Sequence, residues 1–178
     1  MALLAAAGAV PASITQAETA AATADPRLPL VNRLCDLVVP TTATASGAAV
    51  GAGSFVLLAV DHQMSGLSPA ALSLVHIHLD AAAGRPFLQL DAVQQVRVLT
   101  ELDRAAFAAP PGDSAAAAST PEQAWRLLKP AIIAGYYTSE VGASRELVYE
   151  PVPETTRRNF TLTDNYRSRS NEGFGGDL

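Results

Sequence analysis

Apolar residues group into four stretches of the chain, within residues 27–39, 54–61, 68–83 and 90–107. In the first, third and fourth stretches they recur at helical spacing, and in the second they form an unbroken run from Phe55 to Val60. An apolar residue every three to four positions places one hydrophobic face on a helix, so the pattern predicts amphipathic helices. Ser68 and Pro69 have the residue types of an N-cap and a first helical position, and Gly84 is typical of a helix end.

The same spacing predicts which side of each helix is buried. For the first helix the predicted face comprises Leu30, Val31, Leu34, Leu37 and Val38. For the third it comprises Leu72, Val75, Leu79 and Ala83. For the fourth it comprises Val93, Val96, Leu99, Leu102 and Ala106. These faces predict a mainly α protein, with four to six helices around one core.

A fifth helical region begins at Thr120. Thr120, Pro121 and Gln123 have the residue types of an N-cap, a first helical position and the distal residue of a capping box. Because proline lacks an N–H and clashes with the preceding turn, we expect the helix to bend or break near Pro130. A second short helix would follow and end at Gly142.

Aromatic side chains concentrate between Thr120 and Pro153. The segment holds the only tryptophan, Trp125, and three of the four tyrosines: Tyr136, Tyr137 and Tyr149. Pro151 and Pro153 then impose an extended chain. An aromatic-rich core segment is one interpretation of this pattern, and we expect at least one of Tyr136 and Tyr137 to be core.

Composition and charge narrow the class of protein. The 178 residues are 49% hydrophobic and 16% charged, with a net charge of −5. An acidic chain with a single lysine argues against nucleic-acid binding, which needs a concentrated basic face. The preference for arginine suits planar pairing in interfaces, and a GC-rich genome would produce it equally well.

The N-terminal residues have features of an export signal. Residues 2–11 form an apolar run of the right length, and Ala22-Thr23-Ala24 before Asp25 is a small-residue cleavage pattern. No basic residue precedes Arg27, so we expect the positive region to be encoded upstream of Met1. The alternative is an alanine-rich disordered tail. We therefore divide the chain into an export remnant (1–25), a helical domain (26–153) and a tail (154–178).

Two stretches of the chain resemble one family. Residues 135–147 (GYYTSEVGASREL) and 149–153 (YEPVP) are similar to the closing motif of the gluconate 2-dehydrogenase subunit 3 family. Residues 38–49 (VVPTTATASGAA) are similar to an earlier threonine-rich motif of that family. The family usually has a glycine after the final Pro-Val-Pro, whereas this chain has Glu154, and residues 155–178 match no part of the pattern.

The resemblance implies a non-catalytic small subunit of a bacterial sugar or sugar-acid dehydrogenase. It implies no cofactor in this chain, an FAD-dependent large catalytic subunit as partner, and usually a multihaem cytochrome c subunit. It also implies a periplasmic location, with membrane contact only through the complex, and often a twin-arginine signal. The expected role is folding, stability and export of the large subunit.

We expect the partner to contact the aromatic segment and the tail together. The tail is charge-dense with isolated apolar residues, which is typical either of a disordered end or of an arm that orders against a partner. The predicted interface residues are Trp125, Tyr136, Tyr137, Tyr149, Pro151, Pro153, Arg157, Arg158, Tyr166, Arg167, Arg169 and Phe174.

Histidine and cysteine offer the remaining candidate chemistry. His62, His76 and His78 would be the ligands of a small metal-dependent enzyme. Residues two apart on a helix point about 200° apart, which argues against His76 and His78 sharing one ion. Cys35 is either a buried thiol or half of an intermolecular disulfide. A stand-alone exported helical protein is the third hypothesis.

Overall fold

The computed structural model describes residues 25–108, 118–148 and 166–168, and within them the protein is mainly helical. The α-helices are α1 (Leu28–Val38), α2 (Ala52–Asp61), α3 (Pro69–Ala83), α4 (Ala92–Phe107) and α5 (Pro121–Tyr137). Two short 3-10 segments, η1 (Met64–Gly66) and η2 (Phe87–Gln89), and a π turn, η3 (Gly142–Glu146), complete the described elements. The predicted fold class is confirmed.

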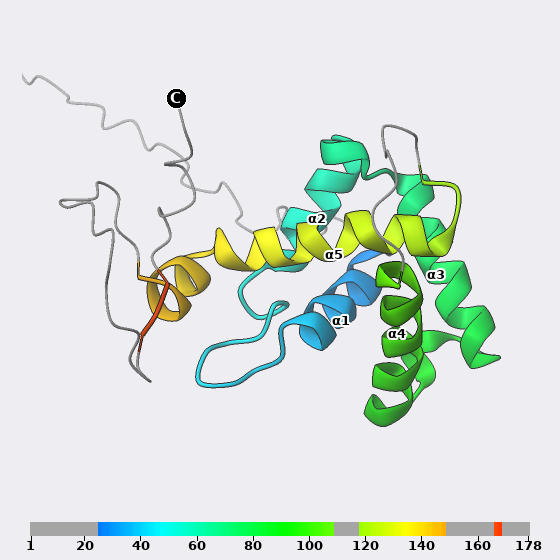
Figure 1. Cartoon of the computed structure of the whole chain (residues 1–178), viewed down its shortest axis with the longest axis horizontal. Helices are drawn as coiled ribbons and strands as arrows, with labels where there is room; N and C mark the ends of the chain where they lie inside the picture. Colours follow the sequence, from blue (N-terminus) through cyan, green and yellow to red (C-terminus); the bar gives the residue numbers. More distant parts are fainter. Residues whose placement is uncertain (1–24, 109–117, 149–165, 169–178) are drawn as a thin grey trace, which may run out of the picture.

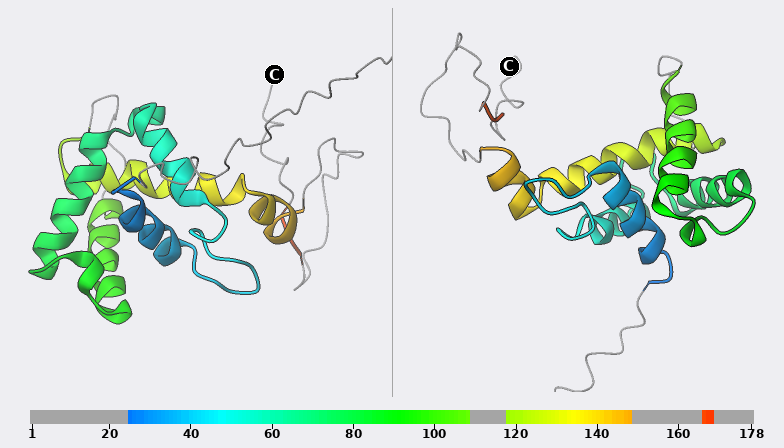
Figure 2. Two further views of the ribbon diagram at one scale, coloured as in Figure 1. Left: turned by 180° about the vertical axis from the view of Figure 1, so that it is seen from behind. Right: turned by 90° about the horizontal axis from the view of Figure 1, so that it is seen from below.

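Helix α5 lies at the centre of the described domain. It contacts α1, α2, α3 and α4, and η3 follows at its C-terminal end (Figure 1). Seen from below, α5 runs from the α3–α4 end of the molecule to η3 (Figure 2). Its buried face contributes Trp125, Leu128, Ile132 and Tyr136 to the core. The segment beginning at Thr120 therefore organises the domain.

Helix α5 is continuous through Pro130, so the predicted break and second helix are wrong. The proline ring lies on the exposed side of the helix, while Leu128 and Ile132 on either side of it are buried. Burial of both turns outweighs the cost of a proline in a helix interior, which is about 3 kcal/mol for the lost hydrogen bond and the ring clash together. Helix packing thus overrides the local preference of proline.

The end of α5 also differs from the prediction. The helix ends at Tyr137 with Thr138 as its C-cap, and Gly142 instead begins the π turn η3. Close packing here requires a residue without a side chain, because a Cβ at Gly142 would lie 2.1 Å from the carbonyl oxygen of Tyr136. Gly142 therefore permits a tight reversal and does not act as a helix stop.

The predicted caps of α3 and α5 are present. Ser68 Oγ accepts a hydrogen bond from the Ala71 amide, and Gly84 at the end of α3 has a left-handed φ of 68°. Thr120 Oγ1 accepts from the Gln123 amide, but the Gln123 side chain accepts from the Ser119 amide and does not complete a capping box with Thr120. The capping residues in the sequence therefore predict the first residue of both helices correctly.

The predicted buried face of α4 is partly wrong. Leu99, Leu102 and Ala106 are buried, but Val93 is 80% exposed and Val96 is 51% exposed. The face is completed by Val98 and by Gln95, whose amide Nε2 donates to the Phe87 carbonyl while its Oε1 accepts from Arg33 Nε at 2.6 Å. A polar side chain with both ends bonded is stable in a core, so hydrophobicity alone misplaced the stripe.

Helix α1 begins at an ion-pair cluster. Arg27 binds Asp25 at 2.6 Å and Asp61 at 2.8 Å, which connects the start of α1 to the end of α2.

Cys35 is a buried free thiol, as the first of the two interpretations predicted. Burial and, to a smaller extent, the negative charge of nearby Asp36 together raise the pKa of Cys35 to about 12, so the thiol stays protonated.

Candidate functional site

The loop of residues 40–46 folds back against the end of α1. The Gly47 amide donates to the Val39 carbonyl oxygen at 2.9 Å, and the Ala48 amide donates to Asp36 Oδ1 at 3.0 Å. A Cβ at Gly47 would lie 2.7 Å from the Cys35 carbonyl oxygen, so glycine allows this close approach. Backbone amides that follow the loop therefore anchor it to the end of α1.

Thr44 joins this loop to the end of α5. Its Oγ1 lies 2.9 Å from Tyr136 Oη and donates a hydrogen bond to Glu146 Oε2 at 2.8 Å. A hydroxyl has one proton, so Thr44 uses it on Glu146 and must accept from Tyr136. The hydrogen bonds therefore run in one direction, from Tyr136 through Thr44 to Glu146.

The reversal after α5 brings Glu146 to this position. Ser139 Oγ donates to the Tyr136 carbonyl at 2.6 Å and accepts from the Gly142 amide at 3.1 Å. These bonds satisfy polar groups that the end of a helix otherwise leaves free. The π turn that follows carries Glu146 back alongside Tyr136.

A hollow of about 310 Å³ opens where the three segments meet, and we call it the Thr44 hollow. Its rim is partly apolar, with Ile133 37% and Tyr137 38% exposed. The rings of Tyr136 and Tyr137 pack edge to face with centroids 5.2 Å apart. Its lining residues are Val38, Val39, Pro40, Thr42, Thr44, Lys129, Ile133, Tyr136, Tyr137 and Glu146.

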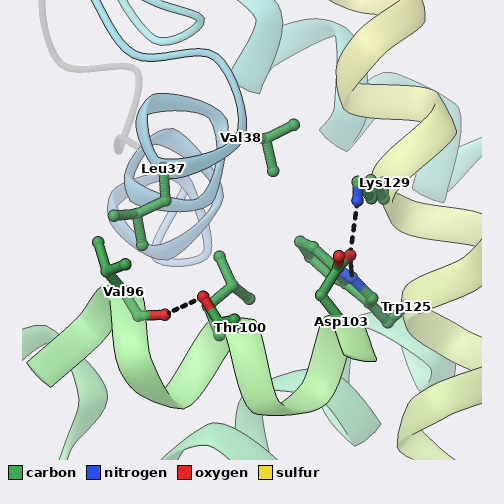
Figure 3. A pocket seen from close by; sticks show the side chains of 8 residues that line it. Leu37, Val38, Val96, Thr100, Asp103, Trp125 and Lys129 are labelled. Atoms are coloured by element: carbon green, nitrogen blue, oxygen red, sulfur yellow. Dashed lines mark hydrogen bonds and ion pairs between the residues drawn. The ribbon is translucent and has the colours of Figure 1, made fainter. Parts of the chain in front are cut away.

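A second hollow, of about 180 Å³, lies between α1, α4 and α5, and we call it the Asp103 hollow. Figure 3 shows Leu37 and Val38 of α1 facing Val96, Thr100 and Asp103 of α4, with Trp125 and Lys129 of α5 closing one side. Val38 and Lys129 line both hollows, so the two are neighbours on one face of the molecule.

Asp103 is the polar centre of the second hollow. Its Oδ1 accepts from Trp125 Nε1 and from Lys129 Nζ, each at 2.7 Å. Partial burial acts to raise the pKa of Asp103, but the hydrogen bonds from Lys129 and Trp125 outweigh it, so the pKa is lowered. Lys129 Nζ also lies 5.0 Å from the centroid of the Phe107 ring. The only lysine of the chain is thus held by a carboxylate and an aromatic face.

The predicted interface residues fall into three groups. Trp125 and Tyr136 are buried, each 1% exposed, so at least one residue of the tyrosine pair is core as expected. Tyr137 and Tyr166 are partly exposed, and Arg167 donates to the Arg145 carbonyl at 2.7 Å. The remaining predictions lie outside the described residues: Tyr149, Pro151, Pro153, Arg157, Arg158, Arg169 and Phe174.

The structure adds residues that the sequence did not single out. Thr44 and Glu146 lie inside the two motif stretches, but their contact joins positions 102 apart. Asp103 lies on α4, 22 residues before Trp125, and no spacing rule predicts that pair. Ile133 follows the buried Ile132, and only the helix orientation shows which of the two faces solvent.

The histidines do not gather at either hollow. His62 and His76 are exposed, and His76 Nε2 lies 3.5 Å from Asp80 Oδ2 one turn later on α3. Within residues 25–108, 118–148 and 166–168, no three His, Cys, Asp or Glu side chains are placed to hold a metal ion. In the same described part, no helix has the length and apolar character to cross a membrane.

The chain is similar to a known protein family over most of its length. The family model of gluconate 2-dehydrogenase subunit 3 matches residues 25–153, which include α1 to α5, η3 and both hollows. The chain matches no curated protein sequence and no solved structure. The match begins at Asp25, the first residue of the Arg27 ion-pair cluster.

Proposed function

The chain belongs to the gluconate 2-dehydrogenase subunit 3 family, and we propose that it is the non-catalytic small subunit of an FAD-dependent sugar or sugar-acid dehydrogenase. In this proposal the flavin belongs to a large partner subunit, and a multihaem cytochrome c subunit accepts the electrons. The complex works in the periplasm and reaches the membrane through its other subunits. The chain supports folding, stability and export of the flavoprotein.

The Thr44 hollow is the observation that carries the proposal. Both stretches that resemble the family, residues 38–49 and 135–147, meet there through the hydrogen bonds of Thr44. The hollow has a partly apolar rim at Ile133 and Tyr137, with polar groups beneath it. Aromatic and apolar side chains beside a small number of polar groups are typical of a protein–protein contact.

Co-purification from the source organism tests the proposal. We expect the tagged full chain to bring down a protein with bound FAD that oxidises a sugar or sugar acid with an artificial electron acceptor. Ile133→Asp places a charge on the rim of the hollow, so the yield of flavoprotein should fall about tenfold or more, because a desolvated unpaired charge costs several kcal/mol.

Ile77→Asp is the matched control. Ile77 is an exposed isoleucine on α3, away from both hollows and 67% exposed, so the same substitution should leave the yield unchanged. Equal yields from the two variants would move the contact away from the Thr44 hollow. A full chain that brings down no flavoprotein would contradict the proposed function.

Export is tested separately. Fractionation of the source cells should place the chain in the periplasm, and N-terminal sequencing of the purified protein should begin at Asp25. Cleavage there would leave the Arg27–Asp25 ion pair intact, because the first described residue is retained. A chain recovered from the cytoplasm without its flavoprotein would contradict this part of the proposal.

A further inference from the structure

The carboxylate of Glu146 lies in the Thr44 hollow without a cationic partner. Among the described residues no Lys, Arg or His nitrogen forms an ion pair with it, and its one hydrogen bond is the 2.8 Å contact from Thr44 to Oε2. A carboxylate has about four acceptor positions, so Oε1 remains available to a ligand. Partial burial of an unpaired charge is costly and favours a bound counter-ion.

The other charge in the hollow is already neutralised. Lys129 lines the hollow, but its Nζ lies 2.7 Å from Asp103 Oδ1 and faces the Phe107 ring. Lys129 therefore offers no free positive charge to Glu146. The net effect is a negative charge at one end of a concave surface, which complements a cation.

The walls of the hollow favour a planar cation over a compact one. The partly exposed ring of Tyr137 packs edge to face on the buried ring of Tyr136, which restricts its orientation. A guanidinium group stacks on an aromatic ring and also pairs with a carboxylate through two N–H groups, whereas an ammonium group is a strongly hydrated point charge. The volume of about 310 Å³ is large enough for one long side chain and several waters.

The position of Glu146 is set before a ligand arrives. Thr44 donates to Oε2, and Thr44 is itself fixed by the buried hydroxyl of Tyr136. A pre-positioned acceptor loses little side-chain entropy on binding. The geometry points to an arginine side chain of the partner protein as the occupant of the Thr44 hollow, paired with Glu146 and stacked on Tyr137. Identification of that partner as the flavoprotein rests on the proposed function.

A peptide titration of the full-length protein tests the site directly. The probes are acetyl-Ala-Arg-Ala-amide and the same peptide with citrulline, which has the same shape without the charge. Chemical-shift changes in two-dimensional NMR spectra should appear at Thr44, Tyr137 and Glu146 with the arginine peptide. The citrulline peptide should bind about tenfold or more weakly, because charged hydrogen bonds are lost. Equal binding of both peptides overturns the proposal.

Three variants localise the binding. Glu146→Gln should reduce affinity for the arginine peptide to that of the citrulline peptide, and Tyr137→Leu should weaken it without abolishing the difference between the peptides. Glu140→Gln removes an exposed carboxylate from the preceding turn, and it should leave the affinities for both peptides unchanged. Unchanged affinity in Glu146→Gln overturns the proposal. The comparison of two peptides on the unaltered protein remains decisive if a variant fails to fold.

Two further results separate the possible occupants. In the full chain with Arg157, Arg158 and Arg169 replaced by Gln, peptide affinity should be unchanged, and tighter binding would assign the hollow to the chain's own tail. If the flavoprotein co-purifies equally with the unaltered chain and Glu146→Gln, the arginine inference fails and the proposed function stands. If the arginine peptide binds but no flavoprotein co-purifies, the proposed function fails and the arginine site stands.

Discussion

The indole Nε1 of Trp125 lies 2.7 Å from Oδ1 of Asp103, and this hydrogen bond joins α5 to α4. Trp125 is almost completely buried, so its N–H has no access to water as an alternative acceptor. The same oxygen of Asp103 also accepts a hydrogen bond from Lys129 Nζ, so one carboxylate binds two donors on α5. Stability at this junction therefore depends on an oxygen acceptor at position 103.

Asp103→Ala should destabilise the protein by about 1–3 kcal/mol, because it leaves the buried indole N–H unpaired. Asp103→Asn retains an acceptor oxygen of similar shape and should cost less. Urea unfolding followed by circular dichroism measures both values. If the two variants unfold at the same urea concentration, the Trp125 hydrogen bond contributes nothing measurable.

Acid should destabilise the fold through Asp25, Asp61 and Asp103. Hydrogen bonds from Arg27 lower the pKa of Asp25 to about 2 and also lower that of Asp61, and the pKa of Asp103 is lowered as well. A carboxyl whose folded pKa is depressed stabilises the fold above its unfolded pKa, about 3.9 for Asp. The contribution is lost as pH falls from about 4 through the folded values.

Arg27→Gln is the variant that checks this pH dependence. It removes the cation that lowers the pKa of Asp25 and Asp61, so the fall in melting temperature between about pH 4 and pH 2 should be shallower. Arg97→Gln, an exposed arginine of α4, serves as the control and should reproduce the unaltered curve. Coincident curves for both variants and the unaltered protein would exclude the Arg27 cluster as the cause.

Gly142→Ala should destabilise the protein more than Gly84→Ala. An added Cβ at Gly142 would meet the Tyr136 carbonyl at 2.1 Å, whereas at Gly84 nothing lies within 4 Å and only the positive φ of 68° is unfavourable. The cost at Gly84 is about 1–2 kcal/mol. Thermal unfolding compares the two variants, and a larger loss at Gly84 would contradict the described packing after α5.

Deletion of residues 155–178 should separate folding from partner binding. Among the described residues it removes the hydrogen bonds from Arg167 to the Arg145 carbonyl and from the Val148 amide to the Ser168 carbonyl, both at the edge of η3. We expect the helical circular dichroism and melting temperature to be nearly unchanged, while the yield of co-purified flavoprotein falls sharply. A truncated chain that captures as much flavoprotein as the full one would show that the tail is not part of the contact.

Helix positions were predictable because their signals are local. Ser68, Gly84 and Thr120 act within one turn of their own position, and the structure places each at the predicted cap. Pro130 is also a local signal, yet it misled, because packing of Leu128 and Ile132 against distant helices decides whether the helix continues. The misplaced face of α4 has a similar origin, since burial of Gln95 depends on Arg33 and on the Phe87 carbonyl.

The candidate site was only partly predictable for the same reason. The sequence indicated the two motif stretches and the tyrosine pair, and the structure shows that the stretches meet. Sequence could not indicate that Thr44 accepts from Tyr136 and donates to Glu146, because these residues are 92 and 102 positions away from it. Long-range pairing of polar side chains depends on the completed fold.

The central place of α5 has a consequence for the order of events during synthesis. It is the last α-helix of the described domain, yet it supplies contacts to each of the four before it. Before residue 137 has left the ribosome, α1 can pack on α2 and α3 on α4, but the apolar surface of these helices that α5 covers stays exposed. A chain that stops before α5 lacks the one helix that contacts all four earlier ones, so we expect its product to keep that apolar surface exposed and to aggregate.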